Sequence, residues 1–338
     1  MFGKLWSRTK ALLSRALLRL FQRKPAEPGR FEAGTQSSFR GLLATAAWIW
    51  PQREYLVYVP QGHEQRGSTP LLVLVHGCRQ TPEDIAAATR IITLADNLAC
   101  LVLLPRQNPR ANAWGCWNWF DSATASGWGE TAIVAAQIEA VRRKYRIDAK
   151  RVFLAGLSSG GGLAAALALR RPDVVAGVFV HSGIACGAAS TPQAALGVLK
   201  GGADTDFKEI AHTARASANR RSLPVPLCVI QGASDDVVAP VNASQLVRQY
   251  LVLNGHPAAD IGQDDELPPP DHTHATTIDT RAVSTSEWRI ANRLVARHVS
   301  VASLGHVWSG GDKDYAYTDP HGPDATALLG AFIRDAIK

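Results

Sequence analysis

Val152-Phe-Leu-Ala-Gly156-Leu-Ser158-Ser-Gly160-Gly-Gly162 is an apolar run that ends in the pattern G-x-S-x-G. The alanine-rich residues 163–169 follow at once, so the pattern predicts a strand, a tight turn and a helix. Such a turn holds its serine in a strained position between the two elements, which is the geometry of a nucleophile elbow. Glycine is needed at 156 and 160 because the two backbones approach closely there and a Cβ atom would clash. Ser158 is therefore the first candidate for a catalytic residue.

Strands and helices alternate on both sides of this turn. Further strands are expected at 55–59, 71–75, 100–104, 174–180, 225–230, 276–283 and 293–302. Further helices are expected at 82–98, 131–145, 242–254 and 324–337. The alternation predicts an α/β fold whose sheet is mainly parallel, with helices on both of its faces. We expect one catalytic domain over 31–338, preceded by a separate segment and linker over 1–30.

The net charge of +7 comes from the first 24 residues, which carry seven basic side chains and no acid. The rest of the chain has 29 basic and 29 acidic residues, so nucleic-acid binding is not expected. No uninterrupted apolar run reaches 18 residues, and a transmembrane helix is not expected either.

Residues 2–21 combine apolar and basic side chains near helical spacing, which predicts a basic amphipathic helix. One interpretation is attachment to a membrane or a polymer-granule surface. The other is a helix packed on its own protein or a partly ordered tail. Arg15 and Arg19 interrupt the apolar core that a cleavable signal peptide requires. The sequence therefore favours a cytoplasmic or a granule- or membrane-associated location.

A serine nucleophile needs a base, and in chains with this kind of elbow an acid and then a histidine follow the serine. Asp235 is the candidate acid, because it follows a strand that ends in Gly232, and Asp236 is its rival. His306 is the candidate base, because it follows a strand and Gly305 and precedes a flexible glycine-rich loop, and His321 is its rival. The carboxylate would hold the imidazole in the required tautomer.

Two backbone N–H groups are candidates for an oxyanion hole. One belongs to Ser159, the residue after the nucleophile, and the other to Cys78 in the His76-Gly77-Cys78 turn after a buried strand. Cys78 and Cys116 fall in loops that should converge, and whether they form a disulfide stays open. No metal is expected, because the isolated His272 and His274 pair is typical of a solvated loop. No cofactor is expected.

Tryptophan is concentrated in the loops near these candidates. Trp117, Trp119 and Trp308 are predicted to line an apolar subsite for an acyl or polymer chain. The alternative is that several of them are core residues, since tryptophan is mostly buried wherever it occurs.

Five motifs taken together resemble one known family. They are His76-Gly-Cys78 with Gln80, Cys116-Trp-Asn-Trp-Phe120, Gly156-Leu-Ser158-Ser-Gly160, Gly232-x-x-Asp235-x-x-Val238-x-Pro240 and Gly305-His306-x-Trp308-x-Gly310-Gly311. The chain resembles the poly(3-hydroxybutyrate) depolymerase family of esterases, which is similar to the feruloyl and acetylxylan esterases, over roughly 54–335. The resemblance implies an α/β-hydrolase fold, serine-esterase chemistry without a cofactor, and Ser158, Asp235 and His306 as the triad. Exported members carry a signal peptide and often a polymer-binding domain, so secretion to the extracellular region is the family-based alternative for location.

These observations predict a serine carboxylic-ester hydrolase that acts through an acyl-enzyme on poly- or oligo-3-hydroxyalkanoate esters. An esterase for feruloyl or acetyl groups on polysaccharide is the alternative with the same chemistry. The alternative from another class is a noncatalytic protein that binds granule or membrane surfaces through residues 2–21.

Overall fold

One ten-stranded sheet organises the computed structural model, which describes residues 29–38, 52–218 and 224–337. The strand order is β1-β2-β4-β3-β5-β6-β7-β10-β9-β8. Six neighbouring strands, from β4 to β10, are parallel, and the strands at both edges pair antiparallel. The predicted sheet is therefore confirmed. The basic helix predicted at 2–21 lies outside the described residues.

The strands are β1 (Arg30–Ser37), β2 (Gln52–Val59), β3 (Thr69–Val75), β4 (Leu101–Pro105), β5 (Ile147–Leu157), β6 (Gly177–His181), β7 (Leu227–Gly232), β8 (His272–Ile278), β9 (Arg281–Ile290) and β10 (Arg293–Val301). A separate two-stranded ribbon pairs β11 (Trp308–Ser309) with β12 (Thr318–Asp319). The helices are α3 (Pro82–Ala88), α4 (Ile91–Leu98), α5 (Ser122–Ala125), α6 (Gly129–Lys144), α7 (Ser159–Arg170), α8 (Pro192–Gly201), α9 (Phe207–Ser217), α10 (Val241–Asn254) and α11 (Ala325–Ala336). Short 3₁₀ turns lie at His63–Gln65 and Pro257–Asp260.

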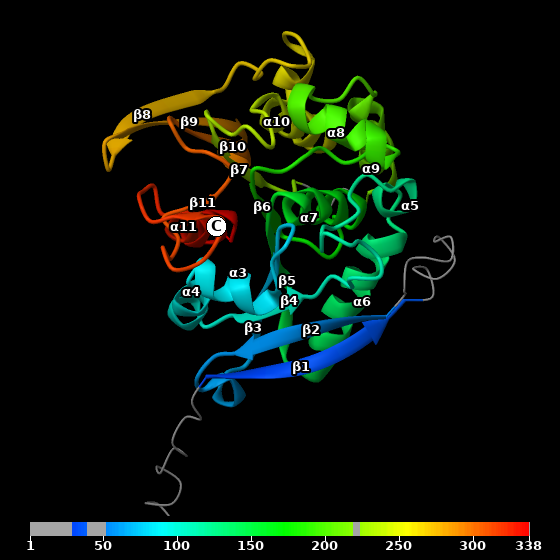
Figure 1. Ribbon diagram of the computed structural model, residues 1–338, viewed down its shortest axis with the longest axis vertical. Coiled ribbons are helices and arrows are strands. Elements are labelled where there is room, and N and C mark those ends of the chain that lie inside the picture. Colours follow the sequence, from blue (N-terminus) through cyan, green and yellow to red (C-terminus); the bar gives the residue numbers. More distant parts are fainter. Residues whose placement is uncertain (1–28, 39–51, 219–223, 338) are drawn as a thin grey trace, which may run out of the picture.

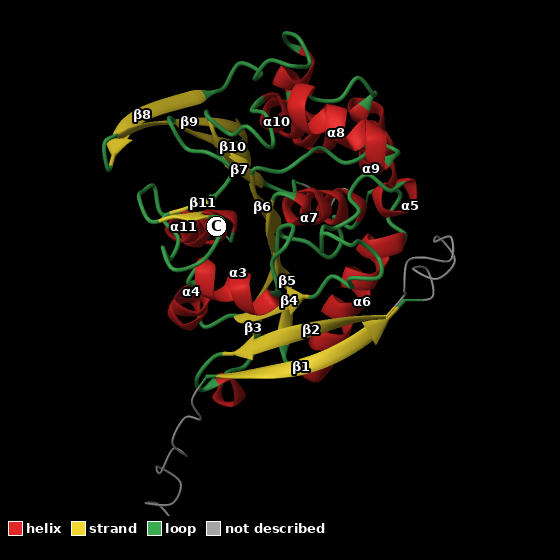
Figure 2. Cartoon of the chain, viewed as in Figure 1, coloured by secondary structure: helices red, strands yellow, loops and turns green. Residues whose placement is uncertain are grey.

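Helices cover both faces of the sheet, as Figure 1 shows. The side chains of α6, α7, α9 and α10 pack into one apolar cluster, and those of α3, α4 and α11 pack into the other. Every residue of β3, β4, β6 and β7 is buried, because a strand covered on both faces needs apolar side chains on both. In Figure 2 the strands form a continuous twisted layer between these two groups of helices.

Two local predictions are wrong, and each has a backbone reason. The helix expected at 82–98 is two helices, because Arg90 takes a left-handed conformation (φ 53°) between α3 and α4. The strand expected at 276–283 contains a turn at Asp279 and Thr280, so these residues belong to the hairpin β8–β9. No helix or strand is expected from the sequence between 184 and 222. The described part of this stretch contains α8 and α9, each of which starts at a side-chain cap, Thr191 and Asp206.

Within the described ranges, no helix is both long enough and apolar enough to span a membrane.

Candidate active site

Ser158 lies at the turn between β5 and α7, with φ 56° and ψ −123°. This conformation is rare for a residue with a side chain and is typical of a strained functional turn. A Cβ atom on Gly156 would lie 2.4 Å from the carbonyl oxygen of Gly160, and one on Gly160 would lie 2.4 Å from the carbonyl oxygen of His76. Both glycines are therefore required by close backbone contacts, as the sequence predicts.

Asp235 and His306 meet beyond the ends of two adjacent parallel strands, β7 and β10. The His306 Nδ1 atom lies 2.9 Å from Oδ2 and 3.1 Å from Oδ1 of Asp235. The close approach of the two loops depends on Gly232, where a Cβ atom would lie 2.2 Å from the carbonyl oxygen of Leu304. The backbone N–H of Ser234 donates to that same oxygen.

Hydrogen bonds fix the Asp235 carboxylate on several sides. The N–H groups of Val237 and Val238 donate to Oδ1, and the side-chain amide of Gln231 donates to Oδ2. Burial alone would raise the pKa of Asp235, but the bonds from His306, Val238 and Ser182 outweigh it and hold that pKa below its usual value. The carboxylate is therefore charged at neutral pH and holds the Nδ1 side of the imidazole, which leaves Nε2 for a proton partner.

The two rivals do not occupy equivalent positions. Asp236 is exposed, and its carbonyl oxygen accepts a hydrogen bond from Lys200. His321 is exposed and pairs with Asp319. The structure thus brings Asp235 and His306 together and places Ser158 at the end of β5, two strands from β7.

The predicted oxyanion residues lie against each other beside Ser158. Ser159 is the first residue of α7, where a helix leaves backbone N–H groups without intrahelical partners. Cys78 follows β3, and its Sγ atom lies 3.4 Å from the Ser159 hydroxyl oxygen. The Gln80 side chain accepts the N–H of Gly77 and fixes the turn next to Cys78.

A disulfide joins Cys78 to Cys116, which settles the pairing that the sequence left open. The bond ties the turn after β3 to the tryptophan-rich loop. The N–H of Trp117 also donates to the Ser159 hydroxyl, so this loop is fixed to the start of α7 as well.

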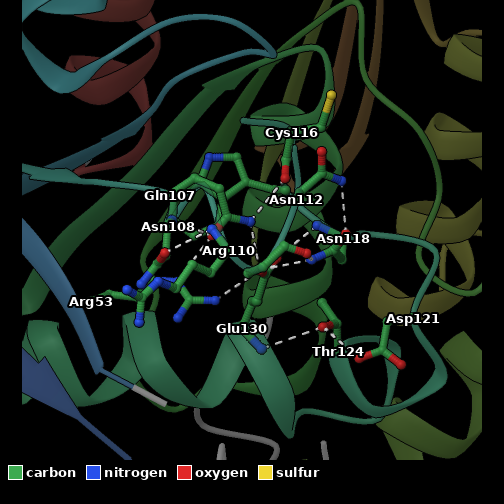
Figure 3. A network of polar contacts seen from close by, with 12 residues as sticks. Arg53, Gln107, Asn108, Arg110, Asn112, Cys116, Asn118, Asp121, Thr124 and Glu130 are labelled. Carbon is green, nitrogen blue, oxygen red and sulfur yellow. Dashed lines mark hydrogen bonds and ion pairs between the residues drawn. The ribbon is translucent and has the colours of Figure 1, made fainter. Parts of the chain in front are cut away.

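A buried polar network around Glu130 holds the loop 106–118 in place, as Figure 3 shows. Glu130, at the start of α6, accepts hydrogen bonds from Arg53, from the Gln107 side chain and from both the backbone and side chain of Asn118. The Arg53 and Glu130 side chains are both fully buried. Gln107 continues the network to the carbonyl oxygen of Cys116.

His76 links the network to the turn after β3. Burial lowers the pKa of His76 to about 4, so the ring is neutral at pH 7. Its Nε2 atom accepts the N–H of Gln107, so the proton is on Nδ1, which lies 2.7 Å from the Gly77 carbonyl oxygen and donates to it. The loop 106–118 and the turn 76–78 therefore form one hydrogen-bonded unit.

The three predicted substrate-contact tryptophans are core residues in this structure. Trp117 and Trp308 have no exposed surface and Trp119 only 5%. The Trp308 ring packs against His181 and Phe179, and Trp119 packs against Gly162 of α7. A side chain without exposed surface cannot contact a substrate, so the structure does not fit the predicted role of Trp117 and Trp308. Contacts with residues far away in the sequence bury them, such as His76 against Trp117 and Phe179 against Trp308, and their clustering in sequence does not show these contacts.

Sequence reasoning missed the polar residues that surround the candidates. Arg53 and Glu130 carry no motif, and only the fold brings them together across 77 positions. His181 and Ser182 follow a buried strand, as His76 does, and that position at a strand end was the one available signal.

The arrangement is that of an α/β-hydrolase, and the comparisons with known proteins agree. The solved structure of an acetyl xylan esterase from Aspergillus awamori matches with a TM-score of 0.64 and 20% identity, covering 81% of this chain and 94% of that one. An S-formylglutathione hydrolase from Agrobacterium tumefaciens matches with a TM-score of 0.53 and 16% identity, covering 94% and 96%. At these identities the likeness establishes the fold.

The family model described as "Esterase PHB depolymerase" matches residues 53–264, and the chain belongs to this family. Poly(3-hydroxyalkanoate) depolymerase C of Paucimonas lemoignei is 28% identical over 59% of this chain and 48% of its own length. Poly(3-hydroxybutyrate) depolymerase of Ralstonia pickettii is 24% identical over 92% and 62%, and feruloyl esterase B of Neurospora crassa is 28% identical over 55% and 65%. The match thus spans less than two thirds of each of these relatives.

Removing the disulfide should lower stability. The bond closes a loop with a sequence separation of 38, for which chain entropy predicts a loss of about 4 kcal/mol in the free energy of unfolding. The double variant Cys78→Ser/Cys116→Ser should show this loss in urea unfolding. A reducing agent should reproduce it in the wild type and leave the variant unchanged. Equal stability of the wild type with and without reductant would contradict the prediction.

Removing the Glu130 carboxylate should destabilise the protein strongly. The Glu130→Ala variant leaves the buried Arg53 guanidinium without its carboxylate, so we expect a loss of about 3–5 kcal/mol in the free energy of unfolding. Glu139→Ala is the matched control on the same helix, because its ion pair with Arg142 is partly exposed and should contribute less than about 1 kcal/mol. Similar losses in the two variants, measured by urea unfolding, would contradict the role given to Glu130.

Proposed function

We propose that this chain is a serine carboxylic-ester hydrolase that acts through an acyl-enzyme. The observation that carries the proposal is the buried Asp235 carboxylate bonded to His306 Nδ1, beyond the strand ends from which the strained Ser158 also projects. Both features support the proposal, because this chemistry requires an oriented base and a turn that presents the nucleophile.

Each residue then has a defined task. His306 Nε2 takes the Ser158 hydroxyl proton as the serine oxygen attacks the ester carbonyl carbon, and Asp235 stabilises the imidazolium that forms. The carbonyl oxygen becomes an oxyanion that the N–H groups of Ser159 and Cys78 stabilise. His306 returns the proton to the leaving alcohol as the ester bond breaks. A water molecule then gives a proton to His306 and attacks the carbonyl carbon of the acyl-enzyme. The bond to the Ser158 oxygen breaks, Ser158 regains the proton from His306, and the carboxylic acid is released.

We propose 3-hydroxyalkanoate esters, as oligomers or polymer, as the substrate class. The family match and the two depolymerase relatives support it. Feruloyl or acetyl esters of polysaccharide are the second candidate, supported by the similarity to feruloyl esterase B and to "Probable acetylxylan esterase A" of Aspergillus clavatus.

The disulfide bears on location, because such bonds persist mainly in oxidising compartments. It supports an exported location, the family-based alternative, over the cytoplasmic one that the sequence favours. Attachment to a membrane or granule surface through residues 2–21 remains a proposal.

The Ser158→Ala variant tests the nucleophile. It should lose hydrolysis of short p-nitrophenyl esters by roughly 10⁴-fold or more in kcat while keeping its circular dichroism spectrum. It should also lose covalent labelling by a fluorophosphonate. Ser126→Ala is the control, because Ser126 is exposed, and it should behave as the wild type. Turnover retained by Ser158→Ala would overturn the assignment of Ser158, whereas no turnover by either the wild type or the variant would favour the noncatalytic surface-binding alternative.

A substrate panel tests the ester class. Product analysis on 3-hydroxybutyrate oligomers, methyl ferulate and acetylated xylo-oligosaccharides should give kcat/KM values about 10-fold or more higher for the hydroxybutyrate esters. A preference of that size for the feruloyl or acetyl esters would replace the first candidate with the second.

A further inference from the structure

His181 and Ser182 lie at the end of β6, the strand between the nucleophile strand β5 and the acid strand β7. Both residues are fully buried. The backbone N–H of Ser158 donates to the His181 carbonyl oxygen at 2.9 Å, and the N–H of Ser182 donates to Ile230 on β7 at 2.9 Å. This dipeptide is therefore bonded to the backbone of Ser158 and to the strand that leads to Asp235.

The contacts of the His181 ring determine where its proton is. The N–H of Ser309 can only donate, and it lies 3.2 Å from His181 Nε2, so Nε2 is the acceptor. Burial lowers the pKa of His181 to about 3, with a smaller contribution from His306, so the ring carries one proton. That proton is on Nδ1, which lies 3.2 Å from the Ser182 hydroxyl oxygen and donates to it.

The Ser182 hydroxyl thus receives a hydrogen bond and has its own proton to give. It faces the Asp235 carboxylate, and this interaction is among those that hold the pKa of Asp235 below its usual value. Serine in this position adopts a left-handed conformation, with φ 52°.

Ser309 connects the other end of this chain of hydrogen bonds to the His306 loop. It follows Trp308 in β11, and its hydroxyl donates to the Pro323 carbonyl oxygen at 2.6 Å. This series of hydrogen bonds therefore runs from the loop that carries His306, through His181 and Ser182, to the carboxylate that binds His306.

We propose that His181 and Ser182 are positioning residues, which bond the Ser158 turn, the Asp235 carboxylate and the His306 loop to one another through the ordered chain Ser309 N–H, His181 and Ser182. The assignment rests on the proposed function, because it presumes that these three residues act as a triad. It gives β6 a role in orienting the acid and the base.

Ser182 variants test the last bond of the chain. Ser182→Ala should lower kcat for a p-nitrophenyl ester by roughly 10- to 100-fold with KM unchanged, the range expected for losing a hydrogen bond to a charged group. Ser182→Gly removes the same hydroxyl but suits the left-handed backbone better. If the residue only shapes the backbone, glycine should restore kcat. The proposal requires that kcat falls in both Ser182 variants. The control Ser286→Ala, at a buried serine of β9, should keep the wild-type kcat.

His181 variants test the direction of the hydrogen bonds that run from Ser309 through His181 to Ser182. In Asn the side-chain amide overlays the Nδ1 side and can still donate to Ser182, whereas in Gln it overlays the Nε2 side and can still accept from Ser309. His181→Asn should therefore keep a higher kcat than His181→Gln. A role in packing alone against Trp308 predicts the reverse order, because Gln is closer to His in size. His298→Asn, at a histidine inside β10 whose pKa burial also lowers to about 4, should keep the wild-type kcat.

The outcomes separate this inference from the proposed function. If Ser158→Ala loses activity but the Ser182 and His181 variants keep the wild-type kcat, the triad stands and the positioning role is wrong. If Ser158→Ala keeps its activity, the triad itself is wrong. Circular dichroism and the thermal midpoint of each variant show whether a lost kcat accompanies loss of the fold.

Discussion

The close approach of β5, α7 and β3 at Gly156 and Gly160 constrains everything around Ser158. With no Cβ atoms at these positions, the start of α7 lies directly on the carbonyl oxygens of Val75 and His76. The same contact that strains Ser158 also brings the turn carrying Cys78 beside it. Ser158 and one wall of the candidate site are therefore placed by a single backbone contact, and a side chain larger than hydrogen at either glycine would separate them.

The rest of the site is held by polar groups that water does not reach. On one side, the Glu130 network and the disulfide fix the loop 106–118 to the turn after β3. On the other, the Asp235 carboxylate receives donors from its own turn and from Gln231 of β7. Buried polar groups are costly unless each one is paired, so such networks favour a single arrangement of the loops. That rigidity suits chemistry in which donors must already be in place when charge develops.

Much of the fold and part of the site could be predicted from local sequence. The apolar runs of β3, β4 and β7 and the glycines of the elbow depend on neighbours along the chain. The order serine, acid, histidine is the one expected after an elbow of this kind. The sequence favoured Asp235, three residues after Gly232, but kept Asp236 as its rival, and the structure pairs Asp235 with His306 and leaves Asp236 exposed. By contrast, the burial of Trp117 and Trp308 depends on contacts with distant residues, and strand β1, which pairs with β2, was not expected from the sequence.

The sequence by itself determined the α/β class and the elbow at Ser158 and favoured Asp235 and His306 over their rivals, because each rests on periodicity, glycine placement or order along the chain. Only the tertiary structure decided that Cys78 bonds to Cys116, that the tryptophans belong to the core, and that His181 and Ser182 join the ends of three strands. Those facts depend on contacts between residues far apart in the chain, which side-chain packing and burial select and no local pattern encodes.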